Sequence, residues 1–108
     1  MDRVTAAWLN ERGDLHDARV SSVHAERSTI QVALDDEWAA HRGISKPHGQ
    51  EAPGTLVIRS FATVEGEPCD VNGGWLSEVR VEGDELSLVF SDKPALRFRK
   101  AEAWWRSA

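Results

Sequence analysis

The chain has 108 residues, of which 41% are hydrophobic and 29% charged, the size and composition of one soluble globular domain, which we expect to span residues 1–108. Its formal net charge of −5 and the absence of any Lys/Arg run argue against a general affinity for nucleic acid or for an anionic membrane surface. No segment approaches the ~18 consecutive apolar residues of a membrane span, and Cys69 is the only cysteine, so we expect a cytoplasmic protein without an intrachain disulfide.

Residues 2–12 predict a short helix. Asp2 is a candidate N-cap, Val4 and Trp8 stand at positions i and i+4, and Gly13 can end the helix in the left-handed conformation. A helix of this length is marginal in isolation, so we expect Val4 and Trp8 to pack on a larger element.

Residues 15–36 predict a β-hairpin. Val20 and Val23 are three positions apart and cannot share a face of a regular strand, so we expect a β-bulge at Ser21-Ser22 to bring them together. The second strand alternates regularly between polar residues and the apolar residues Ile30, Val32 and Leu34.

The middle of the chain is less regular. Residues 39–54 contain several Gly and Pro residues and no period, which indicates a long loop of the kind that often has a function. Residues 55–64 are apolar on both faces around Leu56–Ile58 and predict a central strand, or one covered on its second face. Residues 66–74 predict a turn or a second loop.

Residues 75–90 carry the clearest pattern, a period of two on both sides of Gly83-Asp84. This arrangement predicts a hairpin with a type II′ turn, because only Gly adopts the required positive φ at low cost. With these two residues as the loop, the expected cross-strand pairs are Val81 with Leu86, Val79 with Leu88 and Ser77 with Phe90.

The last predicted strand contains Leu96 and Phe98, and the segment from Ala101 to the end continues either as a strand or as a short helical turn. The fold class that follows is mainly β: a single antiparallel meander of about six strands, closed as a barrel or folded as a small sandwich, with a short N-terminal helix.

The histidines do not match a known metal or catalytic signature. His16 and His24 would stand roughly 26 Å apart on a regular strand, and His16 and Asp17, as neighbours on a strand, would point to opposite faces. His41 and His48 could converge on the nearby carboxylates, yet their spacing resembles no zinc site. No nucleophile elbow or phosphate-binding glycine loop is present, so we expect no cofactor, no metal and no catalytic residue.

The acidic run at the end of the first hairpin suggests a binding surface. An anionic rim beside an aromatic anchor suits a basic protein partner, and one member of the adjacent pair Trp104-Trp105 should face outward and offer a further contact. The predicted partner-binding residues are Asp35, Asp36, Glu37, Trp38, His41, His48 and Trp105.

The segment 14–36, with His16-Asp17-Ala18-Arg19-Val20 followed by an apolar hairpin and an acidic residue, resembles short bacterial β-proteins that open on the pattern H-D-A/S-x-V/I. Some of these resemble immunity proteins, which neutralise toxins delivered between bacteria. The resemblance implies a cytoplasmic protein that binds and blocks a toxin domain without chemistry of its own. It covers residues 14–36 alone and assigns no functional residue.

Three functions therefore remain open. The first is a small acidic protein that binds and inhibits another protein, with a basic toxin domain as a candidate partner. The alternative is a small-molecule-binding or metal-binding β-domain with hydrolytic activity at His41, His48 and the carboxylates. In the third, the chain forms a homodimer through a sheet edge or its tryptophans.

The predicted acidic contact can be tested by substitution. We expect Trp38→Ala to weaken binding of the partner by ~2 kcal/mol or more, as the loss of a buried hot-spot residue does. Asp35→Asn with Asp36→Asn should slow association and reduce its salt dependence. A binding titration over a range of salt concentrations measures both effects, and unchanged affinity and salt dependence in folded variants would place the contact elsewhere.

Overall fold

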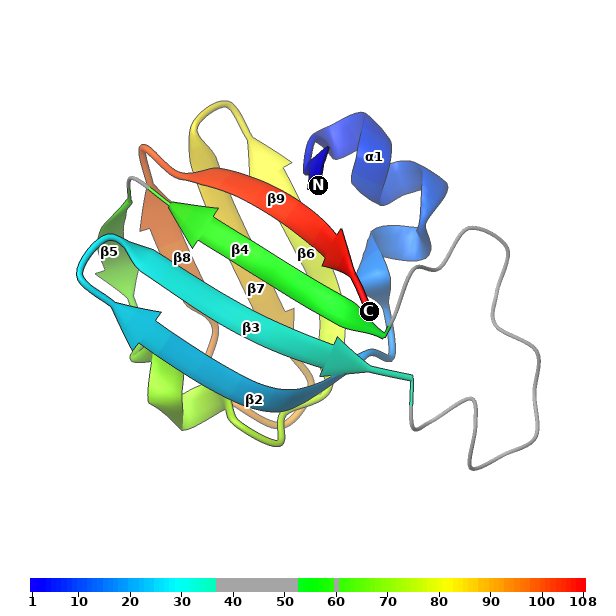
Figure 1. The fold of residues 1–108 in the computed structure, drawn as a ribbon. Helices are drawn as coiled ribbons and strands as arrows, with labels where there is room; N and C mark the ends of the chain where they lie inside the picture. Colours follow the sequence, from blue (N-terminus) through cyan, green and yellow to red (C-terminus); the bar gives the residue numbers. More distant parts are fainter. Residues whose placement is uncertain (37–52, 60) are drawn as a thin grey trace.

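The computed structural model describes residues 1–36, 53–59 and 61–108 (Figure 1). Within them the chain forms two antiparallel β-sheets that enclose one hydrophobic core, with a short helix beside them. The predicted mainly β, antiparallel class is confirmed. The barrel alternative is wrong, because the strands form two separate sheets that do not close into one ring.

The described residues contain nine strands. Sheet A has the order β1-β9-β4-β3-β2, and sheet B has the order β5-β8-β7-β6. Sheet A consists of β1 (Asp2–Arg3), β2 (Arg19–Glu26), β3 (Thr29–Asp35), β4 (Gly54–Arg59) and β9 (Glu102–Ser107). Sheet B consists of β5 (Ala62–Glu65), β6 (Leu76–Glu82), β7 (Glu85–Phe90) and β8 (Leu96–Arg99).

The expected count of six strands is wrong for three reasons. The segment predicted as one strand, 55–64, contributes β4 to sheet A and β5 to sheet B. The C-terminal segment, left open between strand and helix, forms β9, and β1 is too short to show a sequence period. The simple meander is also wrong, because β9 lies between β1 and β4 (Figure 1).

The hairpin of β2 and β3 contains the expected bulge. The register shifts between Val20 and Ser22, so that Val20 pairs with Leu34 and Val23 with Val32. The strand begins at Arg19 rather than at residue 15, however. Gly13–Leu15 form a 3₁₀ turn, η1, and Asp14, Leu15 and Asp17 all have positive φ, which a β-strand does not accommodate.

The hairpin of β6 and β7 also follows its prediction at the tip. Gly83 has a φ of +61° and Asp84 is not in the left-handed region, as a type II′ turn requires. Val79 pairs with Leu88 as expected, but the predicted pair of Ser77 with Phe90 is wrong. The register shifts between Leu76 and Glu78, and Leu76 takes the place opposite Phe90.

Helix α1 (Ala6–Glu11) is shorter than the predicted helix, and its N-cap is Thr5, whose hydroxyl accepts a hydrogen bond from the backbone N–H of Trp8 at 3.1 Å. Asp2 is not the cap. It lies in β1, and its carboxylate accepts a hydrogen bond from the indole N–H of Trp8 at 3.3 Å. The helix lies next to β9 and β6 (Figure 1), and Trp8 and Leu9 are buried.

Trp105 occupies the core with 1% of its surface exposed, and its ring centroid lies 5.7 Å from that of Trp8. Gly54 makes room for this ring, because a Cβ at residue 54 would stand 2.3 Å from a ring carbon of Trp105. The 3₁₀ turn η2 (Pro68–Val71) adds the fully buried Val71. The sheets contribute most of the other core side chains, among them Ile30, Leu34, Leu56, Ile58, Leu76, Leu88, Leu96 and Phe98.

We expect Leu88→Ala to lower the free energy of unfolding by about 2–5 kcal/mol, because the side chain is completely buried and its removal leaves a cavity. Ser87→Ala, on the outer side of the same strand, should change it by about 0.5 kcal/mol or less. Urea denaturation of the two variants measures the difference. Equal effects of the two substitutions would contradict the described packing.

Candidate functional site

Only some of the predicted contact residues lie in the part of the chain that the structure describes. Asp35 and Asp36 belong to the described residues, whereas Glu37, Trp38, His41 and His48 lie outside them. The hydrolytic alternative, which depends on His41 and His48, therefore also lies outside the described residues.

Asp35 does not present an uncompensated charge. It ends β3 opposite Arg19 of β2, and the Arg19 guanidinium donates a hydrogen bond to its carboxylate at 3.1 Å. The same guanidinium lies 5.9 Å from the centroid of the Trp75 ring. Arg19 thus neutralises the first carboxylate of the acidic run, and the side chain of Asp35 is only 25% exposed.

The adjacent tryptophans of β9 lie on opposite sides of sheet A, as neighbours on a strand must. Trp105 was predicted as the contact residue, but its side chain is in the core. Trp104 is half-buried on the outer face, opposite Arg3 on β1 and Val57 on β4. Trp104, not Trp105, is therefore the member of the pair that a partner could reach.

Two arginines contact the Trp104 ring, and a third lies on the same face of sheet A. The guanidinium carbons of Arg3 and Arg59 lie 5.1 and 5.2 Å from the centroid of the Trp104 ring, within the range of cation–π attraction. Arg106, two residues along β9 and therefore on the same face, donates a hydrogen bond to the side-chain oxygen of Gln31 at 2.9 Å. We call this surface, formed by Arg3, Gln31, Val57, Arg59, Trp104 and Arg106, the tryptophan–arginine face.

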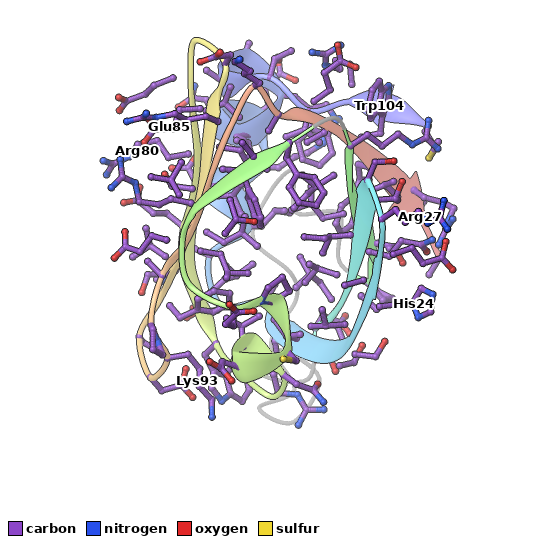
Figure 2. All side chains as sticks on the ribbon, turned by 90° about the vertical axis from the view of Figure 1, so that its left-hand side faces the viewer. His24, Arg27, Arg80, Glu85, Lys93 and Trp104 are labelled. Atoms are coloured by element: carbon purple, nitrogen blue, oxygen red, sulfur yellow. The ribbon has the colours of Figure 1, made fainter. Side chains whose placement is uncertain are left out.

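Packing within the tryptophan–arginine face excludes water from part of it. Val57 points outward and is not part of the core, yet it is only 2% exposed. Its partners in the register are Trp104 on one side and Gln31 on the other. The outer face of sheet A is therefore closed to water at Val57, between Gln31 and Trp104. In Figure 2 the side chains of Trp104, Arg27 and His24 point away from the core on this side of the molecule.

The arginines of this face carry uncompensated charge. Among the residues that the structure describes, no carboxylate forms an ion pair with Arg3, Arg59 or Arg106. Glu102 stands directly opposite Arg59 in the register. The Arg59 guanidinium lies against the Trp104 ring instead and forms no ion pair with Glu102. The six residues of this face therefore carry three positive charges, with Glu102 beside them on β9, although the whole chain has a net charge of −5.

The outer face of sheet B has the opposite character. It carries a shallow hollow in which the arginines are paired: Arg97 donates to Glu85 at 2.6 Å, and Arg80 donates to Glu78 at 2.6 Å. Figure 2 shows Arg80 and Glu85 on the side of the molecule away from Trp104. The hydrogen bond from Arg97 lowers the pKa of Glu85 below its ordinary value of 4.5 and raises that of Arg97. The hollow is lined by Arg80, Glu82, Glu85, Ser87, Val89, Ala95 and Arg97.

The histidines that the structure describes have local partners. His16 donates from Nδ1 to the backbone oxygen of Ser77 at 2.7 Å, and its Nε2 lies 3.4 Å from the Asp17 carboxylate. The prediction that His16 and Asp17 face apart is wrong, because they lie in a turn rather than on a strand. His24 contacts Glu26 at 2.9 Å.

Within residues 1–36, 53–59 and 61–108, no three His, Cys, Asp or Glu side chains gather as metal ligands would. Cys69 is a free, exposed thiol. No helix in these ranges has the length and apolar character needed to cross a membrane.

The sequence analysis missed Arg3, Arg59 and Arg106. The alternation of Glu102, Trp104 and Arg106 would have placed the last two on one face if residues 102–107 had been assigned to a strand. Nothing in the spacing indicates that β1 and β4 flank that strand, so Arg3 and Arg59 could not have been assigned to the same surface. Comparison of the chain with protein-family models, curated proteins and solved structures finds no match.

The ion pair of Glu85 and Arg97 should make stability depend on pH in the acid range. Because the folded-state pKa of Glu85 is lowered, its contribution is present above about pH 4.5 and is lost as the pH falls through the folded-state value. We expect the stability difference between wild type and Glu85→Gln to shrink as the pH falls from about 7 to about 3. Arg97→Gln removes the donor and should abolish the same dependence. Thermal midpoints across this range measure it, and a constant difference would contradict the assignment.

Proposed function

We propose that this protein is a small binding domain that recognises another protein and acts without chemistry of its own, as an inhibitor of the immunity-protein type. The observation that carries the proposal is Trp104, a half-buried tryptophan held among arginines on a solvent-facing sheet. Tryptophan and arginine are the residues most enriched among the few that dominate binding energy at protein interfaces. The resemblance of residues 14–36 supports the same class.

A flat protein-binding surface agrees better with the described geometry than a small-molecule site does. Ligand sites are usually concave and mainly apolar, and they bury most of the ligand. The hollow on sheet B is lined by charged residues whose arginines are already paired with carboxylates. The outer face of sheet A instead offers a regular surface on which Trp104 provides apolar contact among polar neighbours.

Charge assigns different parts of the partner to the end of β3 and to the tryptophan–arginine face. The net charge of −5 favours the approach of a basic protein, such as the toxin domain that the resemblance implies, and Asp36 follows the end of β3. The tryptophan–arginine face repels such a surface. We therefore propose that the partner presents basic groups to Asp36 and uncharged or acidic groups to the region around Trp104.

We expect Trp104→Ala to weaken partner binding by ~2 kcal/mol or more, which is roughly thirtyfold in the dissociation constant. Val89→Ala, which shortens a half-buried apolar side chain on the outer face of sheet B, is the matched control and should leave affinity unchanged. Partners are first isolated by capture from lysates of the native host on immobilised wild type and both variants, and are then titrated individually.

The proposal requires a captured protein that binds to immobilised wild type and to Val89→Ala but not to Trp104→Ala. The Trp104→Ala variant must itself remain folded. Equal capture by all three proteins would move the contact away from Trp104. If wild type retains nothing beyond what an unrelated acidic protein retains, the proposed function is wrong.

A further inference from the structure

The arginines of the tryptophan–arginine face form no ion pair within the part of the chain that the structure describes. The sequence contains 18 Asp and Glu residues against 13 Lys and Arg residues, so carboxylates are in excess. On the outer face of sheet B, Arg80 and Arg97 are both in ion pairs, whereas Arg99 on the same side of β8 forms none with a carboxylate that the structure describes. On sheet A, Arg3, Arg59 and Arg106 form none with any described carboxylate.

The fold holds these guanidinium groups in place by other means. One indole ring lies within 5.2 Å of both the Arg3 and the Arg59 guanidinium carbon, and Gln31 orients Arg106 through a hydrogen bond. Arg3 and Arg59 come from the strands on either side of β9, so two like charges lie against the Trp104 ring, and an anion close to either guanidinium group offsets its charge. Because the arginine side chains are already partly ordered, they lose less conformational entropy when a ligand binds.

We propose that the tryptophan–arginine face binds an acidic segment of the partner protein, with Arg3 and Arg59 as the principal carboxylate receptors and Arg106 as a third. This inference rests on the proposed function, which it makes specific. A guanidinium group presents its N–H donors in a planar fork that matches the two oxygens of a carboxylate.

A carboxylate-bearing segment fits this surface better than nucleic acid does. Proteins that bind single strands stack successive bases on exposed aromatic rings inside a basic groove. Here the only tryptophan on the described outer face of sheet A already has two guanidinium groups against it. The net charge of −5 would also repel a long polyphosphate, whereas a short acidic segment meets mainly the local cationic field.

The direct test uses a fluorescein-labelled decapeptide of alternating Glu and Ser, titrated by anisotropy at about 0.1 M salt. We expect saturable binding to wild type and at least a tenfold loss in the double variant Arg3→Gln/Arg59→Gln. The control Arg80→Gln/Arg97→Gln also removes two positive charges, but from the outer face of sheet B. The long-range repulsion between the protein and the acidic peptide therefore changes equally in both double variants. The control should bind the peptide as wild type does.

A second variant separates the guanidinium fork from charge alone. Arg3→Lys/Arg59→Lys keeps both positive charges but loses the planar donor arrangement, so we expect affinity between those of wild type and the glutamine variant. All substituted side chains at positions 3 and 59 are exposed, and thermal midpoints verify that each variant is folded.

Three results of the peptide titrations would overturn the inference. They are no saturable binding of the peptide to wild type, equal peptide affinity of the glutamine variant and wild type, and tighter binding of a ten-residue oligothymidine than of the peptide with the same loss in the variant. The last result would assign the face to phosphates. A captured partner that tolerates Arg3→Gln/Arg59→Gln but not Trp104→Ala would refute the inference and leave the proposed function intact. Peptide binding without any captured partner would refute the proposed function and leave only the capacity of this face to bind carboxylates.

Discussion

The pairing of β9 with β4 is the contact on which the rest of the described structure depends. It joins residues about fifty positions apart, from Gly54 opposite Ser107 to Arg59 opposite Glu102. β1 pairs with β9 alone, so the attachment of the N-terminal segment to sheet A requires this pairing. A shift of one residue would exchange the two faces of β9 and move Trp105 out of the core.

The same register produces the surface on which the proposed function depends. Because Trp105 points inward, Trp104 must point outward, between a strand from the N-terminus and a strand from the middle of the chain. The cationic groups of this surface are therefore mounted on paired strands rather than on a loop, which favours a fixed geometry. At the end of β3 on the same sheet, Arg19 compensates Asp35, whereas Arg3 and Arg59 form no ion pair with a carboxylate that the structure describes.

The sequence by itself determined the local features of this protein. Alternation identified the β6–β7 hairpin, and Gly83 located its tip, because a positive φ at that position strongly favours glycine. The mismatch between Val20 and Val23 located a bulge, because a strand has a period of two and any departure from it is visible in the sequence. Each of these features depends on residues that are close along the chain.

Only the tertiary structure decided the features that join distant segments. Whether residues 102–107 form a strand or a helical turn depended on a partner strand almost fifty residues away, and that choice determined which tryptophan is buried. The separation of β4 from β5 and of β8 from β9 into two sheets likewise follows from closure of the core. The tryptophan–arginine face combines residues 3, 59, 104 and 106, and no local pattern links them, because spacing along a chain does not specify which strands become neighbours.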